Sequence, residues 1–511
     1  MKPINRYAIL LGFILLIALA VRIWGVSYDL PYIYHPDEPI YVAISQTILR
    51  TGDLNPHFFN YPSLFFYINS LAYLPYYLVG KLLGIFANLQ DIQGPISLAM
   101  GVTKTPLPSG VLLQRMVTVI FGTGVVGLTF AAGKQLSGKA IVGLLAALMV
   151  AVSPTTVSQS RYITPDTFVS FFTVASFLGA VLIYQQGKTR YYLIAALCAG
   201  LAASCKYNGG LIVLPLLGAH FLRYGKASFK QRNLYLAGLV CGLGFLATTP
   251  YALLDFPEFW KDFKFESRHY ATGHAGMEGN TLKWYLAYMW RTGNILYILS
   301  VLGLIRGVFS RSKEIILLSI FPVVYFGFIS SFIVRNDRTF LPLTPFLFLL
   351  AAWFLGFLLA KAKELQSDVG RKVFITAVVC ISIAAFVSPI MLTIKGANQL
   401  TTANSREIAR RWLDENLRLG SKIAIESYSP FVEPARFSVH GFGHIIDQTP
   451  DWYIENGFEY LIFSQGMYGR FYQEPERYQS EVARYDDLFG RFSLVKMFTE
   501  NNFEIRIYKV E

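Results

Sequence analysis

The sequence is poor in charge and in cysteine, and both shortages narrow what the chain can be. Only 15% of its 511 residues are charged, whereas 54% are hydrophobic. A soluble protein of this length needs more polar surface, and the hydrophobic residues come in runs of roughly 17 to 25, the length that crosses a bilayer. The four cysteines lie in or beside these runs, so neither a disulfide framework nor a cysteine metal site is indicated. We therefore expect an integral membrane protein.

The positive charge is divided unevenly along the chain. Residues 397–511 hold 13 basic and 17 acidic residues, whereas the rest holds 32 basic and 15 acidic residues. Most of the basic excess lies in short loops between apolar runs, which indicates membrane orientation rather than nucleic-acid binding. We expect membrane lipids as partners and no nucleic acid.

Eleven spans are expected within residues 1–396, which we take as the transmembrane module. They lie near 8–26, 110–132, 138–154, 167–186, 190–205, 207–223, 232–250, 285–306, 313–332, 338–360 and 372–394. The positive-inside rule then places the N-terminus in the cytoplasm and residues 397–511 outside the cytoplasmic membrane. The two ends of the module lie on opposite sides only if the number of spans is odd, so the segment 63–83 must not complete a crossing. Its many tyrosines and Pro75 are typical of an interfacial helix, and a full crossing is the alternative.

Residues 397–511 are expected to form an extracytoplasmic α/β domain. An amphipathic helix is predicted over 405–417, and short strands over 422–426, 459–463, 494–498 and 504–510. The predicted fold is therefore a polytopic α-helical membrane protein with a soluble α/β domain at its C-terminal end.

The first outward loop, residues 27–109, carries two adjacent carboxylates. Asp37 and Glu38 lie between Pro36 and Pro39, just before a predicted helix. Prolines fix the backbone, and a helix N-terminus stabilises negative charge. A carboxylate held there can accept a proton from a hydroxyl group as a general base. The alternative is an acidic helix N-cap without chemistry.

Three motifs in this order resemble a known family. His-Pro-Asp-Glu at 35–38, with Gly-Asp-Leu-Asn-Pro at 52–56 and Tyr-Pro-Ser-Leu at 61–64, resembles the first outward loop of GT-C membrane glycosyltransferases. The likeness is to the branch of the protein O-mannosyltransferases and the lipid A aminoarabinose transferases. Ser-Arg-Tyr-Ile-Thr-Pro-Asp at 160–166 and Arg-Asn-Asp-Arg-Thr-Phe-Leu-Pro at 335–342 are similar to two later motifs of that family. The chain departs from the aminoarabinose transferases at 60–62, where Asn-Tyr-Pro replaces their Lys-Pro.

The resemblance implies an inverting glycosyltransferase whose donor is a sugar on a polyprenyl phosphate. It implies that Asp37 is the general base, that Glu38 supports Asp37 or orients the sugar, and that Asp166 is a second acid of the cleft. The acceptor is a hydroxyl group on a protein, lipid or glycan. No cofactor is expected. A divalent metal bound through oxygens of Asp37, Glu38 and Asp166 is the less favoured alternative.

The departing lipid phosphate is anionic, so the site needs cations at the membrane surface. Outward cations that could serve include Arg115, Arg268 and His269, and the favoured candidates are Arg161, Lys206, Arg335, Arg338 and His57. Lys206 lies between two apolar runs, where an unpaired charge is costly and usually functional; cations that snorkel to the interface are the alternative reading.

The outward loop 255–284 is aromatic and charged, with glycines at 273, 276 and 279. That composition suits a mobile lid over the donor, and a plain connecting loop is the alternative.

Two other functions compete with this interpretation. A transporter or flippase of lipid-linked sugars would explain the spans and basic residues, but transport favours polar residues at the middle of the membrane and repeated halves. A scaffold that displays the C-terminal domain leaves the acidic loop unexplained.

Overall fold

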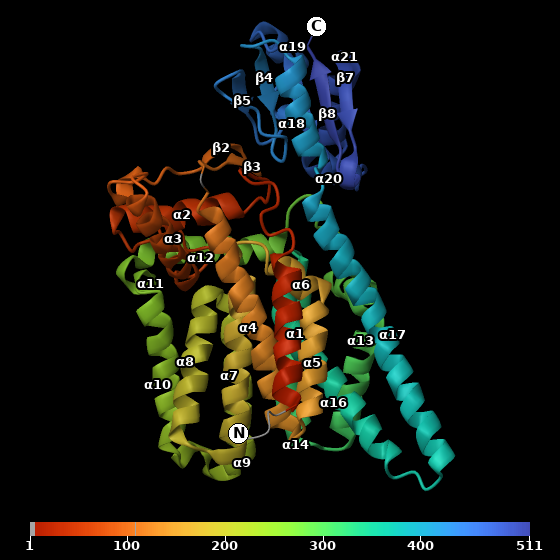
Figure 1. Cartoon of the computed structure of the whole chain (residues 1–511). Helices are drawn as coiled ribbons and strands as arrows, with labels where there is room; N and C mark the ends of the chain where they lie inside the picture. The colour runs from red at the N-terminus through yellow and green to blue at the C-terminus, as the bar shows by residue number, and fades with distance from the viewer. Residues whose placement is uncertain (1–5, 108, 511) are drawn as a thin grey trace.

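Long apolar helices form a bundle, and two sheets lie beyond one end of it (Figure 1). The structure is a computed structural model that describes residues 6–107 and 109–510. Seven of the described helical segments are long and apolar enough to cross a membrane. They contain α1 (Arg6–Ile23), α4 (Val111–Ser137), α7 (Asp166–Gln186), α13 (Thr281–Phe309), α14 (Lys313–Ser330), α16 (Thr344–Ala362) and α17 (Asp368–Thr401).

Shorter helices complete the bundle. Three of them are apolar, namely α5 (Ala140–Val152), α8 (Thr189–Cys205) and α10 (Arg232–Thr248). The expected span at 207–223 begins as a 3₁₀ turn, η2 (Tyr207–Ile212), and becomes α-helical only in α9 (Val213–Tyr224). The expected span at 338–360 likewise begins with a short helix, α15 (Asp337–Phe340), and a 3₁₀ turn before α16. The total of eleven spans therefore stays a prediction.

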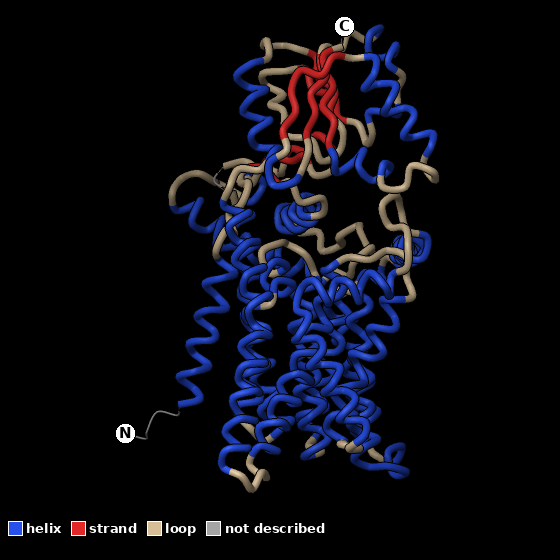
Figure 2. The backbone as a smooth tube through the Cα atoms, turned by 90° about the vertical axis from the view of Figure 1, so that its right-hand side faces the viewer, coloured by secondary structure: helices blue, strands red, loops and turns tan. Residues whose placement is uncertain are grey.

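Several helices lie across the end of the bundle that faces the C-terminal domain (Figures 1 and 2). They are α2 (Glu38–Thr51), α3 (Leu64–Leu82) and α12 (Phe256–Thr272), with the short α6 (Pro154–Gln159) and α11 (Tyr251–Leu254) nearby. Helix α3 is the ambiguous segment of the sequence; it contains Pro75 and packs against α2. A small antiparallel sheet lies above them, in the order β1 (Tyr32–Ile33), β3 (Val102–Lys104), β2 (Ile96–Ala99).

The C-terminal region is a five-stranded sheet with helices on both faces. The strand order is β5 (Ser438–Gly441), β4 (Lys422–Ile425), β6 (Tyr460–Ser464), β8 (Ile505–Lys509), β7 (Ser493–Phe498). Strand β4 is parallel to β5 and β6, whereas β8 is antiparallel to both of its neighbours. Side chains alternate between the two faces of a strand. Accordingly, Ile423 and Ile425 pack with α18 (Ser405–Asn416), and Ala424 packs with the cluster formed by α19 (Pro450–Glu455), α20 (Gln465–Tyr472) and α21 (Gln479–Arg491).

The amphipathic helix and the four strands expected here are present. Strand β5 and helices α19 to α21 were not expected. Helix α17 continues to Thr401, and α18 begins at Ser405, so only residues 402–404 separate the last long helix from the domain.

The small sheet of the first outward loop docks directly on this domain. Val102 is fully buried in the same core as Ile425. The amide of Tyr428 donates to the carbonyl of Met100 at 2.8 Å. A Cβ atom at Gly441 would lie 1.8 Å from the carbonyl oxygen of Leu98. The backbones of the first outward loop and of the C-terminal domain are therefore in contact. The domain is held both by this loop and by its connection to α17.

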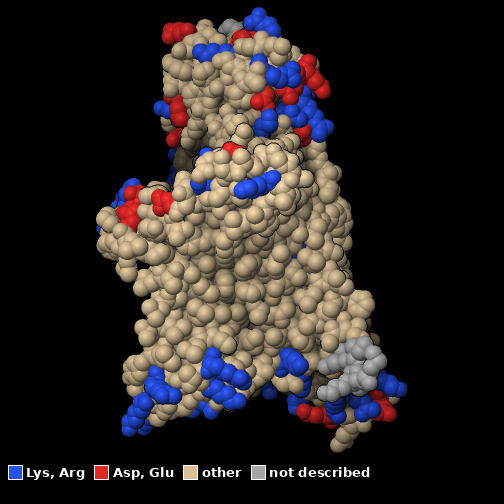
Figure 3. Space-filling model, turned by 60° about the vertical axis from the view of Figure 1, so that its left-hand side comes forward, with Lys and Arg blue, Asp and Glu red and all other residues tan. Residues whose placement is uncertain are grey.

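Charge is segregated along the axis of the bundle. In the face shown, Lys and Arg side chains gather at the end opposite the C-terminal domain, and a wide belt almost free of charge follows (Figure 3). Acidic side chains are frequent only beyond that belt, on the outward loop and the C-terminal domain. The basic loops expected on one side thus do lie together, and their assignment to the cytoplasm stays a prediction.

Replacing Gly441 with alanine is expected to detach the C-terminal domain from the first outward loop, because the new methyl group overlaps the backbone of Leu98. Overpacking of this kind costs about 1–3 kcal/mol. The measurement is the midpoint of thermal unfolding in detergent, together with cleavage of residues 402–404 by a broad-specificity protease. Gly490→Ala is the matched control, since a Cβ atom there meets nothing within 4 Å. Equal behaviour of the two variants would contradict the docking described here.

Candidate functional site

The first motif forms the start of α2, and the side chain of its aspartate is not used to cap the helix. Asp37 is the N-cap residue, but its side chain makes no capping hydrogen bond. The ring of His35 does this instead, because Nδ1 accepts from the amides of Asp37 and Glu38 at 3.2 and 3.3 Å. Burial lowers the pKa of His35, which keeps the ring neutral and able to accept. The Asp37 carboxylate is therefore available for other contacts.

Asp37 forms an ion pair with Arg338 of α15. Burial alone would raise the pKa of Asp37, but the Arg338 guanidinium outweighs it and holds the pKa below its ordinary value of 3.8. The carboxylate is therefore ionised at neutral pH. Its side chain is 31% exposed and that of Arg338 is 20% exposed, so both remain reachable from the cavity that they line. The structure thus brings together the first and last of the three motifs.

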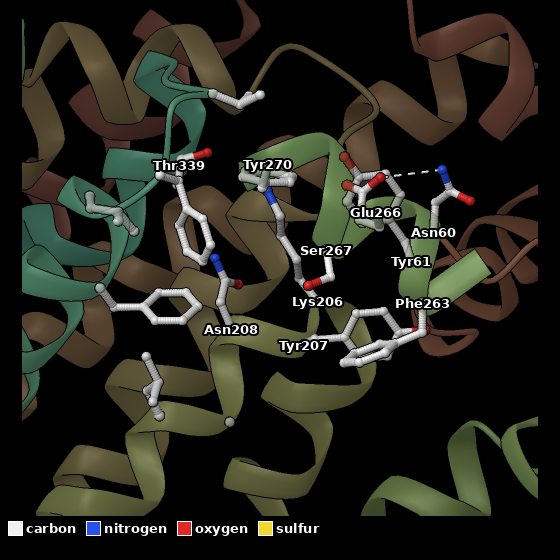
Figure 4. Close-up of a pocket in the computed structure, with 16 residues that line it drawn as sticks. Asn60, Tyr61, Lys206, Tyr207, Asn208, Phe263, Glu266, Ser267, Tyr270 and Thr339 are labelled. Carbon is white, nitrogen blue, oxygen red and sulfur yellow. Dashed lines mark hydrogen bonds between the residues drawn. The ribbon is translucent and has the colours of Figure 1, made fainter. Parts of the chain in front are cut away.

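Two cavities share part of their lining in this region, and the ion pair lines the larger of them. The larger, which we call the polar cleft, has a volume of about 1070 Å³ and is lined by Asp37, Arg338 and residues of the C-terminal domain. The smaller, which we call the apolar pocket, has a volume of about 370 Å³ and contains Lys206 among phenylalanines (Figure 4). Both are lined by Asn60, Tyr61, Glu266, Tyr270 and Val334. The two cavities are therefore adjacent, with these five residues common to both.

Lys206 occupies the break between α8 and η2. Its backbone is extended (φ −158°, ψ 134°), so the helix ends at Cys205 and the side chain turns into the apolar pocket, toward Tyr270 (Figure 4). Its ammonium group lies 2.8 Å from Oδ1 of Asp166, the first residue of α7. Both side chains are almost fully buried, at 6% and 1% exposed. Asp166 lines neither cavity; it supports the lysine from behind.

Glu38 is fully buried and points away from both cavities. Its carboxylate accepts two hydrogen bonds from Arg115, at 3.1 and 2.8 Å, one from the Tyr28 hydroxyl and one from the amide of Ile163. Arg115 also donates to the carbonyls of Val26 and Tyr28. The pair thereby joins α2, α4, the end of the first span and the loop of the second motif. Of the two roles expected for Glu38, these contacts match the supporting one.

The three remaining candidates lie at different places. Arg161 donates to the carbonyl of Val21 and lines a separate cavity of about 260 Å³ with Asp337. Arg335 donates to the carbonyls of Met277, Glu278 and Gly279. It thus holds the loop in which the three predicted lid glycines all have positive φ, at 70°, 87° and 100°. His57 is exposed and paired with Asp53.

Sequence reasoning missed the contribution of α12. The segment 255–284 was read as a loop, whereas residues 256–272 form a helix. Glu266 and Tyr270 are four residues apart, which places them on one face of a helix, and both line the two cavities. Burial raises the pKa of Glu266, although Lys206 and Arg338 oppose this effect. The Asn60 amide donates to its carboxylate at 3.2 Å (Figure 4).

The three carboxylates that the sequence predicted for the site are each paired with a cation. Asp37 contacts Arg338, Glu38 contacts Arg115 and Asp166 contacts Lys206. Within residues 6–107 and 109–510 there is no group of three His, Cys, Asp or Glu side chains placed to hold a metal ion. The expectation that the protein works without a metal stays a prediction.

Comparison with known proteins places this architecture among glycosyltransferases. A family model for dolichyl-phosphate-mannose-protein mannosyltransferases matches residues 65–261. A comparison with curated protein sequences finds no match. The chain resembles ArnT from Cupriavidus metallidurans bound to undecaprenyl phosphate, with a TM-score of 0.57, 14% identity and 98% coverage of both chains.

Oligosaccharyltransferase from Archaeoglobus fulgidus in its apo form gives a TM-score of 0.58 at 13% identity, over 92% of this chain and 71% of that one. The same organism's AglB, in complex with an inhibitory peptide and a dolichol-phosphate, gives 0.57 at 12% identity, over 93% and 72% of the two chains. The resemblance to GT-C membrane glycosyltransferases that the three motifs indicated is confirmed, and the fold is theirs.

Replacing Arg115 with methionine is expected to destabilise the protein strongly, because Glu38 would be left as a buried charge without its partner. Removing one member of a buried ion pair costs about 3–5 kcal/mol. The free energy of unfolding in detergent measures the loss. The double variant Glu38→Gln/Arg115→Met should recover part of it, since no charge is then left unpaired. A single variant as stable as the double variant would show that the pair does not hold the loop.

Proposed function

We propose that the protein is an inverting glycosyltransferase that moves a sugar from a polyprenyl-phosphate donor to a hydroxyl acceptor, with Asp37 as the general base. The reaction takes place at the outer face of the cytoplasmic membrane, at the end of the bundle that carries the C-terminal domain. One observation carries the proposal: the ionised carboxylate of Asp37 lines a polar cleft, and this cleft shares five lining residues with an apolar pocket that contains a buried lysine.

The two cavities suit the two ends of such a donor. Phenylalanines and aliphatic side chains line the apolar pocket, including Phe263, Phe328 and Phe332, and they suit the first isoprene units of the lipid. Lys206 provides a positive charge in the same pocket for the phosphate. The sugar then lies at the shared wall, near Asn60, Glu266 and Tyr270, and the acceptor enters through the polar cleft.

The chemistry follows from this placement. The acceptor hydroxyl attacks C1 of the sugar from the face opposite the phosphate, Asp37 takes the hydroxyl proton, and the bond from C1 to the phosphate oxygen breaks. The electron pair of that bond leaves with the lipid phosphate, whose charge Lys206 and Arg338 stabilise. A single displacement of this kind inverts the configuration at C1.

Arg338 has two possible partners in this scheme. Without substrate it pairs with Asp37, which holds the base as a weak proton acceptor. A donor phosphate offers the guanidinium a second anion, and a carboxylate released from the pair becomes more basic. Donor binding therefore prepares Asp37 for its role.

The other predicted residues take supporting roles in this proposal. Glu38 fixes the start of α2 through Arg115, and Asp166 holds Lys206 in its orientation. Arg335 stabilises the loop beside the polar cleft, at the position expected for a lid. We assign no contact with the donor to Arg161 or His57, because they line neither cavity.

Asp37→Asn should lower the release of polyprenyl phosphate by about 10²–10⁴-fold, the usual loss when a general base is removed. The assay uses purified protein, a panel of radiolabelled polyprenyl-phosphate monosaccharides and membranes that supply the acceptor. Glu266→Gln is the matched variant, since it neutralises a second carboxylate of the polar cleft, the one that also lines the apolar pocket, and it should lose less. The reverse ranking would assign the base to Glu266. Uptake of labelled lipid by vesicles without cleavage would favour a transporter.

Arg338→Gln should move the acid limb of the pH profile upward. The deprotonated form of Asp37 is the active form, and its lowered pKa extends the activity of the native protein toward lower pH. Without Arg338 the effect of burial prevails, so activity should be lost at a higher pH. The profile of kcat/KM between pH 4 and 8 measures the shift. Arg338→Lys should retain most of the wild-type kcat/KM at low pH. An unchanged limb in Arg338→Gln would disprove the coupling.

A further inference from the structure

The C-terminal domain forms one wall of the polar cleft. Ser427 and Tyr428 follow β4, Gly443 and His444 follow β5, and Met467 and Arg470 lie in α20, directly after β6. These three strands are mutually parallel, so their carboxyl ends lie at the same edge of the sheet. In open α/β sheets, ligands bind outside the carboxyl ends of the strands. Here that edge faces Asp37 across the cleft.

Arg470 is unusual among the charged residues that line the polar cleft. Arg338 is paired with Asp37, Glu266 accepts from Asn60, and Asp337 accepts from Gln159. Among the described residues, no carboxylate lies within 4.0 Å of Arg470. Its guanidinium donates to the Tyr428 hydroxyl at 2.8 Å and lies 4.9 Å from the centre of that ring. The same domain gives other arginines acidic partners, for example Arg506 with Glu504 and Arg410 with Glu407.

The position of Arg470 is fixed by neighbours on both sides. Tyr428, on which it lies, is tied to the first outward loop through the carbonyl of Met100. The aliphatic part of Arg470 lies against Gly276, where an added Cβ atom would be 3.5 Å from Cγ. The guanidinium is thus half-buried at the junction of the domain, the outward loop and the lid segment. A cation held in this way and lacking a counter-ion is prepared to bind an anion.

We propose that Arg470 binds an anionic group of the acceptor, a phosphate or a carboxylate, so that the acceptor is a negatively charged molecule. This inference rests on the proposed function and adds the chemical class of the acceptor to it. The guanidinium offers two parallel N–H groups to such an anion, and the Tyr428 ring beside it offers a face for a sugar ring. The donor phosphate is the other possible anion, but Lys206 and Arg338 already serve it on the membrane side of Asp37.

The test compares two reactions of the same protein. Labelled polyprenyl-phosphate monosaccharide is given to purified wild-type protein, Arg470→Gln, Arg470→Lys and the control Arg484→Gln, which alters an exposed arginine of α21 outside the cleft. Release of polyprenyl phosphate to water is measured without acceptor. Transfer is then measured against increasing amounts of membrane extract. The labelled product, freed of donor and digested with protease, is applied to an anion exchanger.

Arg470→Gln should need at least about tenfold more extract for half-maximal transfer, as expected for loss of a charge-assisted hydrogen bond. Release to water should stay unchanged, Arg470→Lys should be intermediate, Arg484→Gln should match wild type, and the product should bind the exchanger. A neutral product, or the same extract dependence in Arg470→Gln, would overturn the inference. A parallel fall in release to water would also overturn it, by assigning Arg470 to the donor phosphate. Failure of wild-type protein to cleave any donor would remove the proposed function and this inference together.

Discussion

The buried contact between Glu38 and Arg115 is the constraint on which the candidate site depends. It lies at the end of the bundle, where the lipid gives way to loops, and it ties together segments that are far apart in the sequence. A charge buried there without a partner is strongly destabilising, so the start of α2 has little freedom to shift. Asp37, one residue earlier, inherits that fixed position. The carboxylate that lines the cleft is therefore positioned by a neighbour that does not line it.

Two further contacts have the same supporting role, in which a residue outside the two cavities holds a group beside one of them. Lys206 faces the apolar pocket and Asp166 lies behind it. Arg335 lies under the loop that contains Gly273, Gly276 and Gly279, and its hydrogen bonds to three carbonyls fix that loop beside the cleft. The two adjacent acids of the first motif likewise differ: Asp37 lines the polar cleft, whereas Glu38 is buried against Arg115.

The sequence predicted the features that depend on neighbouring residues, namely the helices, the strands and the acidic motif. The apolar runs predicted most of the long helices, short segments within residues 397–511 predicted four strands of the C-terminal domain, and the acidic motif indicated Asp37. The sequence could not predict which residues form ion pairs with each other. Glu38 with Arg115, and Lys206 with Asp166, are contacts between residues far apart in the sequence. Helix α12 was missed because its aromatic and charged residues were read as a loop. Arg470 had no distinguishing sequence signal; its importance comes only from lying opposite Asp37 and lacking an acidic neighbour.

Helix α17 is both a bundle helix and the support of the C-terminal domain. Little of its apolar surface is buried in the protein, and it stands apart from the other helices over much of its length (Figure 1). Only residues 402–404 lie between it and the domain, so the domain cannot swing on a flexible tether. If the distance between the C-terminal domain and the bundle changes, α17 has to tilt, and this helix is surrounded mainly by lipid. The lipid acyl chains around α17 therefore help to set the distance between the C-terminal domain and Asp37.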